Sequence, residues 1–212
     1  MADPVGDELI VSLSRPGGNI TGTIFLGAEL IAKRFGLLKD AISGLSRVAA
    51  LWHPAAYGKR TMDGMLKETE TAALALGLQL QLVPAPGPGD LDAAFVAMTR
   101  ERADAVVLLP SPMLFVEHKC IVELAAKSRI PAMYAAREFV EGGGLMSYGA
   151  SQPDLFQTRR HVCGQNPQGR QPGRSARGAA DKAGVRPQSE NGEGTGVPTP
   201  REFLLLADEV IE

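Results

Sequence analysis

Hydrophobic and polar positions follow two alternating patterns between about residues 30 and 149. Short apolar runs bounded by glycine, proline or charged residues predict strands at residues 47–54, 78–85, 104–112, 130–135 and 143–149. Apolar residues recur at helical spacing over residues 28–42, 58–77, 90–103 and 114–129. The pattern therefore predicts strands that alternate with single helices.

Strands joined by single helices pair in parallel through right-handed crossovers. The strand runs are continuously apolar, which is typical of a sheet covered by helices on both faces. We therefore expect an α/β fold with a doubly wound parallel sheet. Ligands of such sheets bind at the carboxyl ends of the strands, and this edge would carry Trp52, His53, Pro54, Pro110, Ser111, Pro112, Tyr134, Arg137, Glu138, Ser147 and Tyr148.

Composition is that of a soluble globular protein. The chain has 212 residues, of which 44% are hydrophobic and 5% aromatic, with a formal net charge of −2. No run reaches the roughly 18 apolar residues of a membrane span, and no basic segment followed by an apolar core marks an export signal. As written, the chain is expected to be cytoplasmic. Cys120 and Cys163 have neither metal-ligand spacing nor a disulfide framework.

Motifs of covalent chemistry are missing from the sequence. It has no phosphate loop, no glycine fingerprint after a strand, no G-x-S-x-G elbow, no H-E-x-x-H and no paired CxxC. We therefore expect no catalytic residues, no cofactor and no metal, and favour binding without chemistry over an enzyme.

Two candidate groups leave alternatives open. His53 either contacts a ligand or is an ordinary loop residue, whereas His118 is expected on a helix surface. Arg137 and Glu138 either bind the charged ends of a small zwitterion, since guanidinium recognises carboxylate, or pair locally in solvent.

Several long segments carry a family resemblance. They include "ADPVGDELIVSLSRPGGNITG", "LLKDAISGLSRVAALWHP", "FVEGGGLMSYG" and "REFLLLADEVIE". In this order they resemble the substrate-binding protein family of ABC transporters that includes TrpX-like proteins, over residues 2–156 and about 197–212. The resemblance implies a type I periplasmic-binding fold, in which two α/β lobes close on a small ligand by hinge bending. It also implies a small polar ligand such as an amino acid, a membrane permease as partner, and a periplasmic location.

The resemblance also divides the chain. Residues 1–29 correspond to the last part of a first lobe with a hinge crossing, and residues 30–156 to a second α/β lobe. Relative to the family, the chain is expected to be truncated at its N-terminus, without most of the first lobe and without the export signal. Asp3, in the first-lobe segment, joins His53, Pro54, Ser111, Pro112, Tyr134, Arg137 and Glu138 as an expected ligand-binding residue.

Residues 157–196 depart from the family sequence. This Arg/Gly-rich stretch holds only Val162 and Val185 as sizeable aliphatic residues, a composition that predicts disorder. Shifted by one nucleotide, its codons permit "AATYVDKILKGANP", which resembles the family and restores helical apolar spacing. We infer a frameshift near Gln157 or Thr158 and a compensating one near Gly196, after which residues 197–212 form a C-terminal helix in the family frame. Binding by the chain as encoded is therefore expected to be impaired.

Two other functions remain as alternatives. Basic residues of this stretch would supply phosphate contacts in a nucleic-acid-binding arm, namely Arg159, Arg160, Arg170, Arg174, Arg177, Lys182 and Arg186. Aromatic stacking residues are missing from it and acidic residues dilute its charge, so no nucleic-acid partner is expected. The other alternative is a small α/β-domain enzyme, which lacks a recognisable catalytic set.

Accurate sequencing of the genomic locus tests the frameshift hypothesis. We expect the corrected sequence to restore the family frame between Gln157 and Gly196, and the region upstream of Met1 to encode an export signal and a first lobe. A locus that reads as printed would contradict this expectation.

Overall fold

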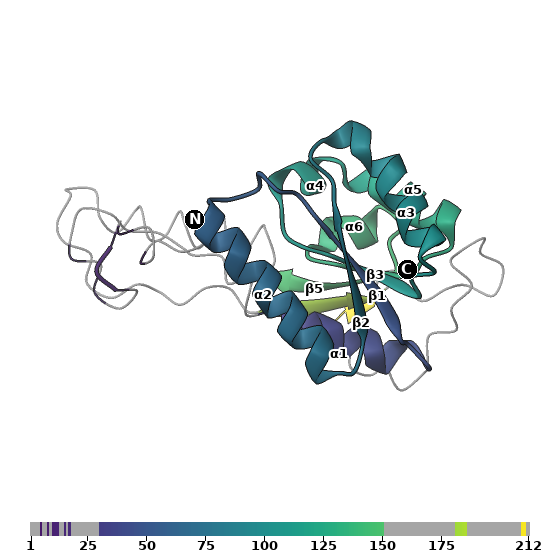
Figure 1. Ribbon diagram of the computed structural model, residues 1–212, viewed down its shortest axis with the longest axis horizontal. Coiled ribbons are helices and arrows are strands. Elements are labelled where there is room, and N and C mark those ends of the chain that lie inside the picture. The colour runs from purple at the N-terminus through teal and green to yellow at the C-terminus, as the bar shows by residue number, and fades with distance from the viewer. Residues whose placement is uncertain are drawn as a thin grey trace. The chain divides into compact units, whose positions relative to one another are not determined.

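The computed structural model describes residues 5, 8, 10–12, 15, 17, 30–150, 181–185 and 209–210. The chain divides into two compact units, one made of Met1–Leu26 and Ala150–Asp181, the other of Gly27–Gly149 and Lys182–Glu212. Most of the described residues belong to the second unit, and Figure 1 draws the residues outside the described set as a thin grey trace. The sequence predicted the corresponding boundaries at residues 30 and 156.

Helices and strands alternate through the second unit, as the hydrophobic pattern predicts. In chain order the elements are α1 (Ile31–Ala41), β1 (Arg47–Trp52), α2 (Lys59–Ala75), β2 (Gln79–Pro84), the short helix η1 (Pro88–Asp90), α3 (Leu91–Arg100), β3 (Ala105–Leu108), α4 (Pro112–Val116), α5 (His118–Ser128), β4 (Ala132–Tyr134), α6 (Arg137–Glu141), β5 (Met146–Ala150), β6 (Asp181–Val185) and β7 (Glu209–Val210).

The strands form one sheet in the order β2-β1-β3-β4-β5-β6-β7. From β2 to β5 every neighbouring pair is parallel, with Ala50 of β1 opposite Leu82 of β2 and Val107 of β3. The α/β fold class and the doubly wound parallel sheet are therefore confirmed.

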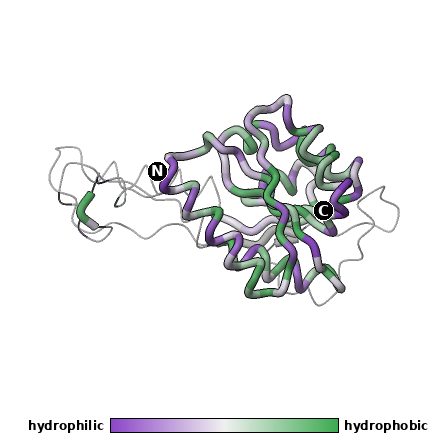
Figure 2. Tube along the Cα trace, viewed as in Figure 1, coloured by the Kyte–Doolittle hydropathy of each residue, from purple (hydrophilic) through white to green (hydrophobic). Residues whose placement is uncertain are grey.

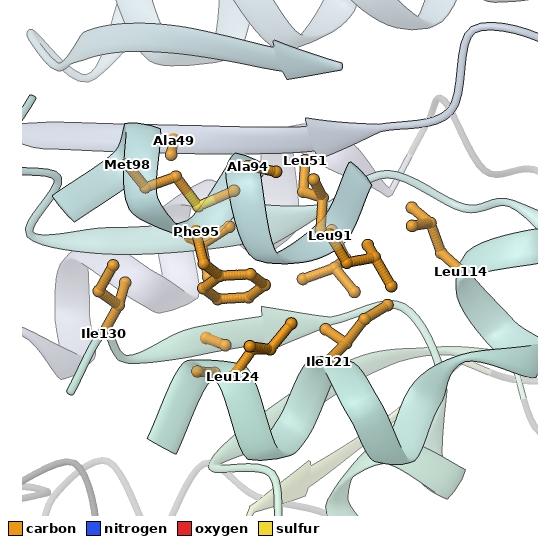
Figure 3. Close-up of a cluster of buried hydrophobic side chains, with 14 of the residues drawn as sticks. Ala49, Leu51, Leu91, Ala94, Phe95, Met98, Leu114, Ile121, Leu124 and Ile130 are labelled. Carbon is orange, nitrogen blue, oxygen red and sulfur yellow. The ribbon is translucent and has the colours of Figure 1, made fainter. Parts of the chain in front are cut away.

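Helices cover both faces of this sheet. One buried cluster joins α1 and α2 to residues such as Val48 and Met133, and a second joins α3, α5 and α6 to their strand neighbours on the other face, such as Ala49 and Tyr134. Figure 3 shows side chains of α3 and α5, including Phe95, projecting into the second cluster. β3 is hydrophobic and buried along its length, whereas the helices alternate between hydrophobic and hydrophilic positions (Figure 2), because only one side of each helix is buried.

Besides η1 and α6, which the pattern did not predict, three elements differ from the predictions. The helix expected over residues 114–129 is two helices, α4 and α5, that meet at Glu117. At the break, the Nδ1 atom of His118 lies 3.0 Å from the Phe115 carbonyl, which a backbone N–H would use in a continuous helix.

The other two differences are β6 and β7. They lie in segments for which the sequence predicted disorder and a helix, respectively. Their parallel pairing uses backbone groups, which almost any residue offers whatever the hydrophobic pattern. The remainder of residues 157–212 lies outside the described residues.

Gly149 gives the clearest test of how β5 packs against the segment after β4. A Cβ at this position would lie 2.1 Å from the carbonyl oxygen of Ala135. Gly149→Ala should therefore force the backbones apart and lower the free energy of unfolding by about 2–3 kcal/mol, measured by urea denaturation.

Gly64→Ala is the matched control. Gly64 lies within α2 and nothing would lie within 4 Å of its added Cβ. Alanine is the better helix former, so this variant should gain about 0.5–1 kcal/mol. Equal stability of the two variants would contradict the packing described for Gly149.

Candidate functional site

The candidate site lies where the winding of the sheet reverses. β1 has β2 on one side and β3 on the other, and the helices after β1 and β3 pack on opposite faces of the sheet. Ligands of doubly wound sheets bind outside the carboxyl ends of the strands at such a switch point. The loops after β1 and β3 are therefore the first place to look for functional side chains.

Backbone pairing brings these two loops together. Leu109 donates its N–H to the carbonyl of Leu51 at 2.9 Å, which continues the contact between the strands past the end of β3. Just beyond, the Nδ1 atom of His53 lies 3.2 Å from the hydroxyl oxygen of Ser111. The structure thus joins two residues that the sequence predicted for this edge.

Ser111 is fixed by the helix that it caps. Its hydroxyl oxygen accepts the Leu114 N–H at 3.4 Å, and its carbonyl accepts the Phe115 N–H at 3.0 Å. Pro112 stands at the first position of α4, where the missing N–H costs nothing. Only 7% of Ser111 is exposed, so its hydroxyl has a defined position against the half-buried ring of His53.

Trp52 adds a buried donor before His53. Among the described buried side-chain atoms, its indole Nε1 is one of those that have no hydrogen-bond partner. Its ring packs beside the cluster formed by α1, α2 and the sheet. A buried N–H without an acceptor is costly, and sequence reasoning did not mark Trp52 as a donor.

Tyr134 does not reach the predicted edge. Its side chain is 1% exposed and lies in the cluster with α3 and α5. The ring stacks on Phe139 with centroids 4.7 Å apart, and burial raises the pKa of the Tyr134 phenol well above its usual value. The structure therefore places Tyr134 in the core, because alternate residues of a strand face opposite layers.

Arg137 and Glu138 lie at the start of α6. Arg137 Nε is 2.7 Å from Glu141 Oε1, one helical turn away, and about half of each side chain is exposed. This geometry is the local pairing that the sequence left open as one alternative, and an exposed pair of this kind adds little stability. Glu138 is half-buried on the same helix.

The remaining predicted residues are scattered around the edge. Pro54 and Pro112 are exposed, Ser147 is buried in β5, and Tyr148 is half-buried. Asp3 lies outside the described residues.

Arg34 is a polar residue of this edge that sequence reasoning missed. It is 0% exposed, and its Nε donates to the carbonyl of Tyr148 in β5 at 2.7 Å. A signal was present, because Ile31, Arg34 and Leu38 share the helical spacing of the buried face of α1. The arginine thus ties α1 to the last residues of β5.

Metal and membrane sites were also sought. Within the part of the chain that the structure describes, no three His, Cys, Asp or Glu side chains gather as metal ligands. None of the described helices has the length and apolar character needed to cross a bilayer.

Comparison with known proteins assigns the family. A family model described as ABC transporter substrate binding protein matches residues 1–209. The chain belongs to the ABC transporter substrate-binding protein family. The resemblance drawn from the sequence is thereby confirmed. No match was found among the curated proteins.

Solved structures show the same fold. The ABC domain in complex with L-Trp from Streptococcus pneumonia is 22% identical, with a TM-score of 0.83 and coverage of 99% of this chain and 69% of that chain. A conserved domain protein from Vibrio cholerae is 19% identical, with the same TM-score and coverage. A ligand-free, open substrate-binding protein with adhesive properties from Clostridium difficile is 16% identical, with a TM-score of 0.63 and coverage of 94% and 69%. The fold of this ABC transporter substrate-binding family member is therefore that of periplasmic binding proteins.

Ser111→Ala tests whether the hydroxyl that contacts His53 also caps α4. Loss of the hydroxyl leaves the Leu114 N–H without its acceptor, and the free energy of unfolding should fall by about 1 kcal/mol. Ser43→Ala is the matched control, because it also replaces a serine hydroxyl but lies in an exposed turn. It should change the free energy of unfolding by less than about 0.5 kcal/mol. Equal effects in thermal or urea denaturation would contradict the capping role.

Proposed function

We propose that this chain is the solute-binding component of an ABC importer and that the edge around His53 and Ser111 binds a small polar solute such as an amino acid. The observation that carries the proposal is the 3.2 Å contact between His53 Nδ1 and Ser111 Oγ. It places two hydrogen-bonding side chains at the switch point of a doubly wound sheet, in a chain whose family binds substrates.

The chemistry of the edge suits reversible capture. Imidazole, hydroxyl and indole N–H groups can orient a polar solute by hydrogen bonds, and none of them needs to react. The related structure from Streptococcus pneumonia holds L-Trp, which supports an amino acid as the solute. In the proposed role the bound solute passes to a membrane permease, and the protein acts in the periplasm.

The same His–Ser contact is the observation that favours the alternative, a small α/β enzyme. In serine hydrolases a third polar group orients the imidazole through its other nitrogen. Among the described residues, no side chain forms a hydrogen bond with Nε2 of His53. Binding without covalent chemistry is therefore the function that the geometry supports better. The basic residues of the nucleic-acid alternative lie in or beside residues 157–196, almost all of them outside the described residues.

We also propose that the chain as encoded binds weakly. Binding proteins of this fold close two lobes on the ligand, so each lobe contributes part of the contact free energy. The frameshift inferred for residues 157–196 would replace the family sequence of that stretch. A dissociation constant of about 1–10 mM is expected.

Titration of the ¹⁵N-labelled full chain with L-tryptophan, followed by NMR, tests this function. Amide shifts should change around His53 and Ser111, because these two residues form the proposed site. His53→Ala should abolish the changes. Glu70→Gln, at an exposed position of α2, is the control and should leave them unchanged.

Two outcomes would contradict the proposals separately. No amide shift near His53 with any of the twenty amino acids at about 10 mM would refute the binding site. Micromolar binding would contradict the impairment while supporting the site.

A further inference from the structure

The hydroxyl proton of Ser111 determines the polarity of the binding edge. A serine oxygen carries one proton and two acceptor lone pairs. One lone pair receives the Leu114 N–H. The proton needs an acceptor of its own, because Ser111 is 7% exposed and a buried hydroxyl that donates to nothing is costly.

The ring of His53 is placed to supply that acceptor. Its Nδ1 atom lies 3.2 Å from Ser111 Oγ, and no other acceptor for this hydroxyl is found among the described residues. A neutral imidazole with Nδ1 as acceptor carries its proton on Nε2. The tautomer of His53 is therefore coupled through one hydroxyl to the backbone at the start of α4.

We propose that His53 presents Nε2–H as a hydrogen-bond donor, so that the solute group bound at this edge is an acceptor oxygen, such as a carboxylate or carbonyl oxygen. Hydrogen bonds run in one direction from the Leu114 N–H through the Ser111 hydroxyl to the His53 ring, and each polarises the next. This inference rests on the proposed function for its ligand, but the tautomer itself does not. For an amino acid, it places the carboxylate rather than the ammonium group against His53.

The tautomer can be measured without any ligand. In the full chain with ¹⁵N-labelled histidine, at a pH where the imidazole is neutral, the chemical shifts of the two ring nitrogens report which one carries the proton. We expect Nε2 of His53 to be protonated, with His53→Gln used to assign the signals among the three histidines.

Ser111→Ala and Ser43→Ala form the matched pair for this measurement. Removing the Ser111 hydroxyl should shift the Nδ1 signal of His53, because Nδ1 loses the proton donor that holds it as an acceptor. Ser43→Ala should leave that signal in place. A His53 ring with its proton on Nδ1, or one that does not respond to Ser111→Ala, would overturn the inference.

The ligand class is tested with L-tryptophan and tryptamine, which lacks the carboxylate. Tryptamine should bind at least about tenfold more weakly, because a hydrogen bond to a charged acceptor is lost. His53→Gln, which keeps an N–H donor near the position of Nε2, should weaken L-tryptophan binding by about threefold, against about tenfold or more for His53→Leu.

Different results would overturn the acceptor assignment and the solute-binding function. Equal binding of tryptamine and L-tryptophan at this edge would overturn the acceptor assignment while leaving the binding function standing. An Nε2–H tautomer in a chain that binds no amino acid would overturn the proposed function and, with it, the assignment of a solute to this donor.

Discussion

The parallel pairing of β1 with β3 is the constraint on which the candidate site depends. It aligns the carboxyl ends of two strands that are far apart in the chain, and the Leu109–Leu51 backbone hydrogen bond extends that alignment into the loops. Because β2 lies on the other side of β1, this pair also marks the point where the winding reverses. His53 and Ser111 meet there as a direct consequence of strand order and register.

Polar groups at this edge are held from several directions within an apolar framework. Ser111 is positioned by the first turn of α4, and His53 by Ser111. Arg34, buried in α1, is bonded to the backbone of β5. Groups held in this way lose little conformational freedom when a solute binds, so more of the contact free energy appears as affinity.

Family membership and local geometry support the proposed function by different routes. The family match covers nearly the whole chain and concerns what such proteins do. The His–Ser contact concerns how this lobe would do it, and the hydrogen-bond direction proposed for Ser111 narrows the chemistry of the solute group. The fold alone would not indicate a solute-binding role, since doubly wound sheets also carry enzymes. The contact between His53 and Ser111 alone would not indicate it either.

The sequence by itself determined the α/β class, the alternation of helices and strands over residues 28–150, the family, and the edge to which His53 and Ser111 belong. The class, the alternation and the edge follow from hydrophobic periodicity and chain order, which are local properties, whereas the family follows from the resemblance of long segments. The tertiary structure decided which candidates contact one another. His53 lies against Ser111, and Arg137 pairs with Glu141. Tyr134 is buried in the core. It also revealed the hydrogen bond from Arg34 to the Tyr148 carbonyl, the break at Glu117 and the strand β6. Those outcomes depend on strand order, on which face each residue of a strand meets, and on backbone pairing between distant segments, and none of these is encoded in the spacing of residues along the chain.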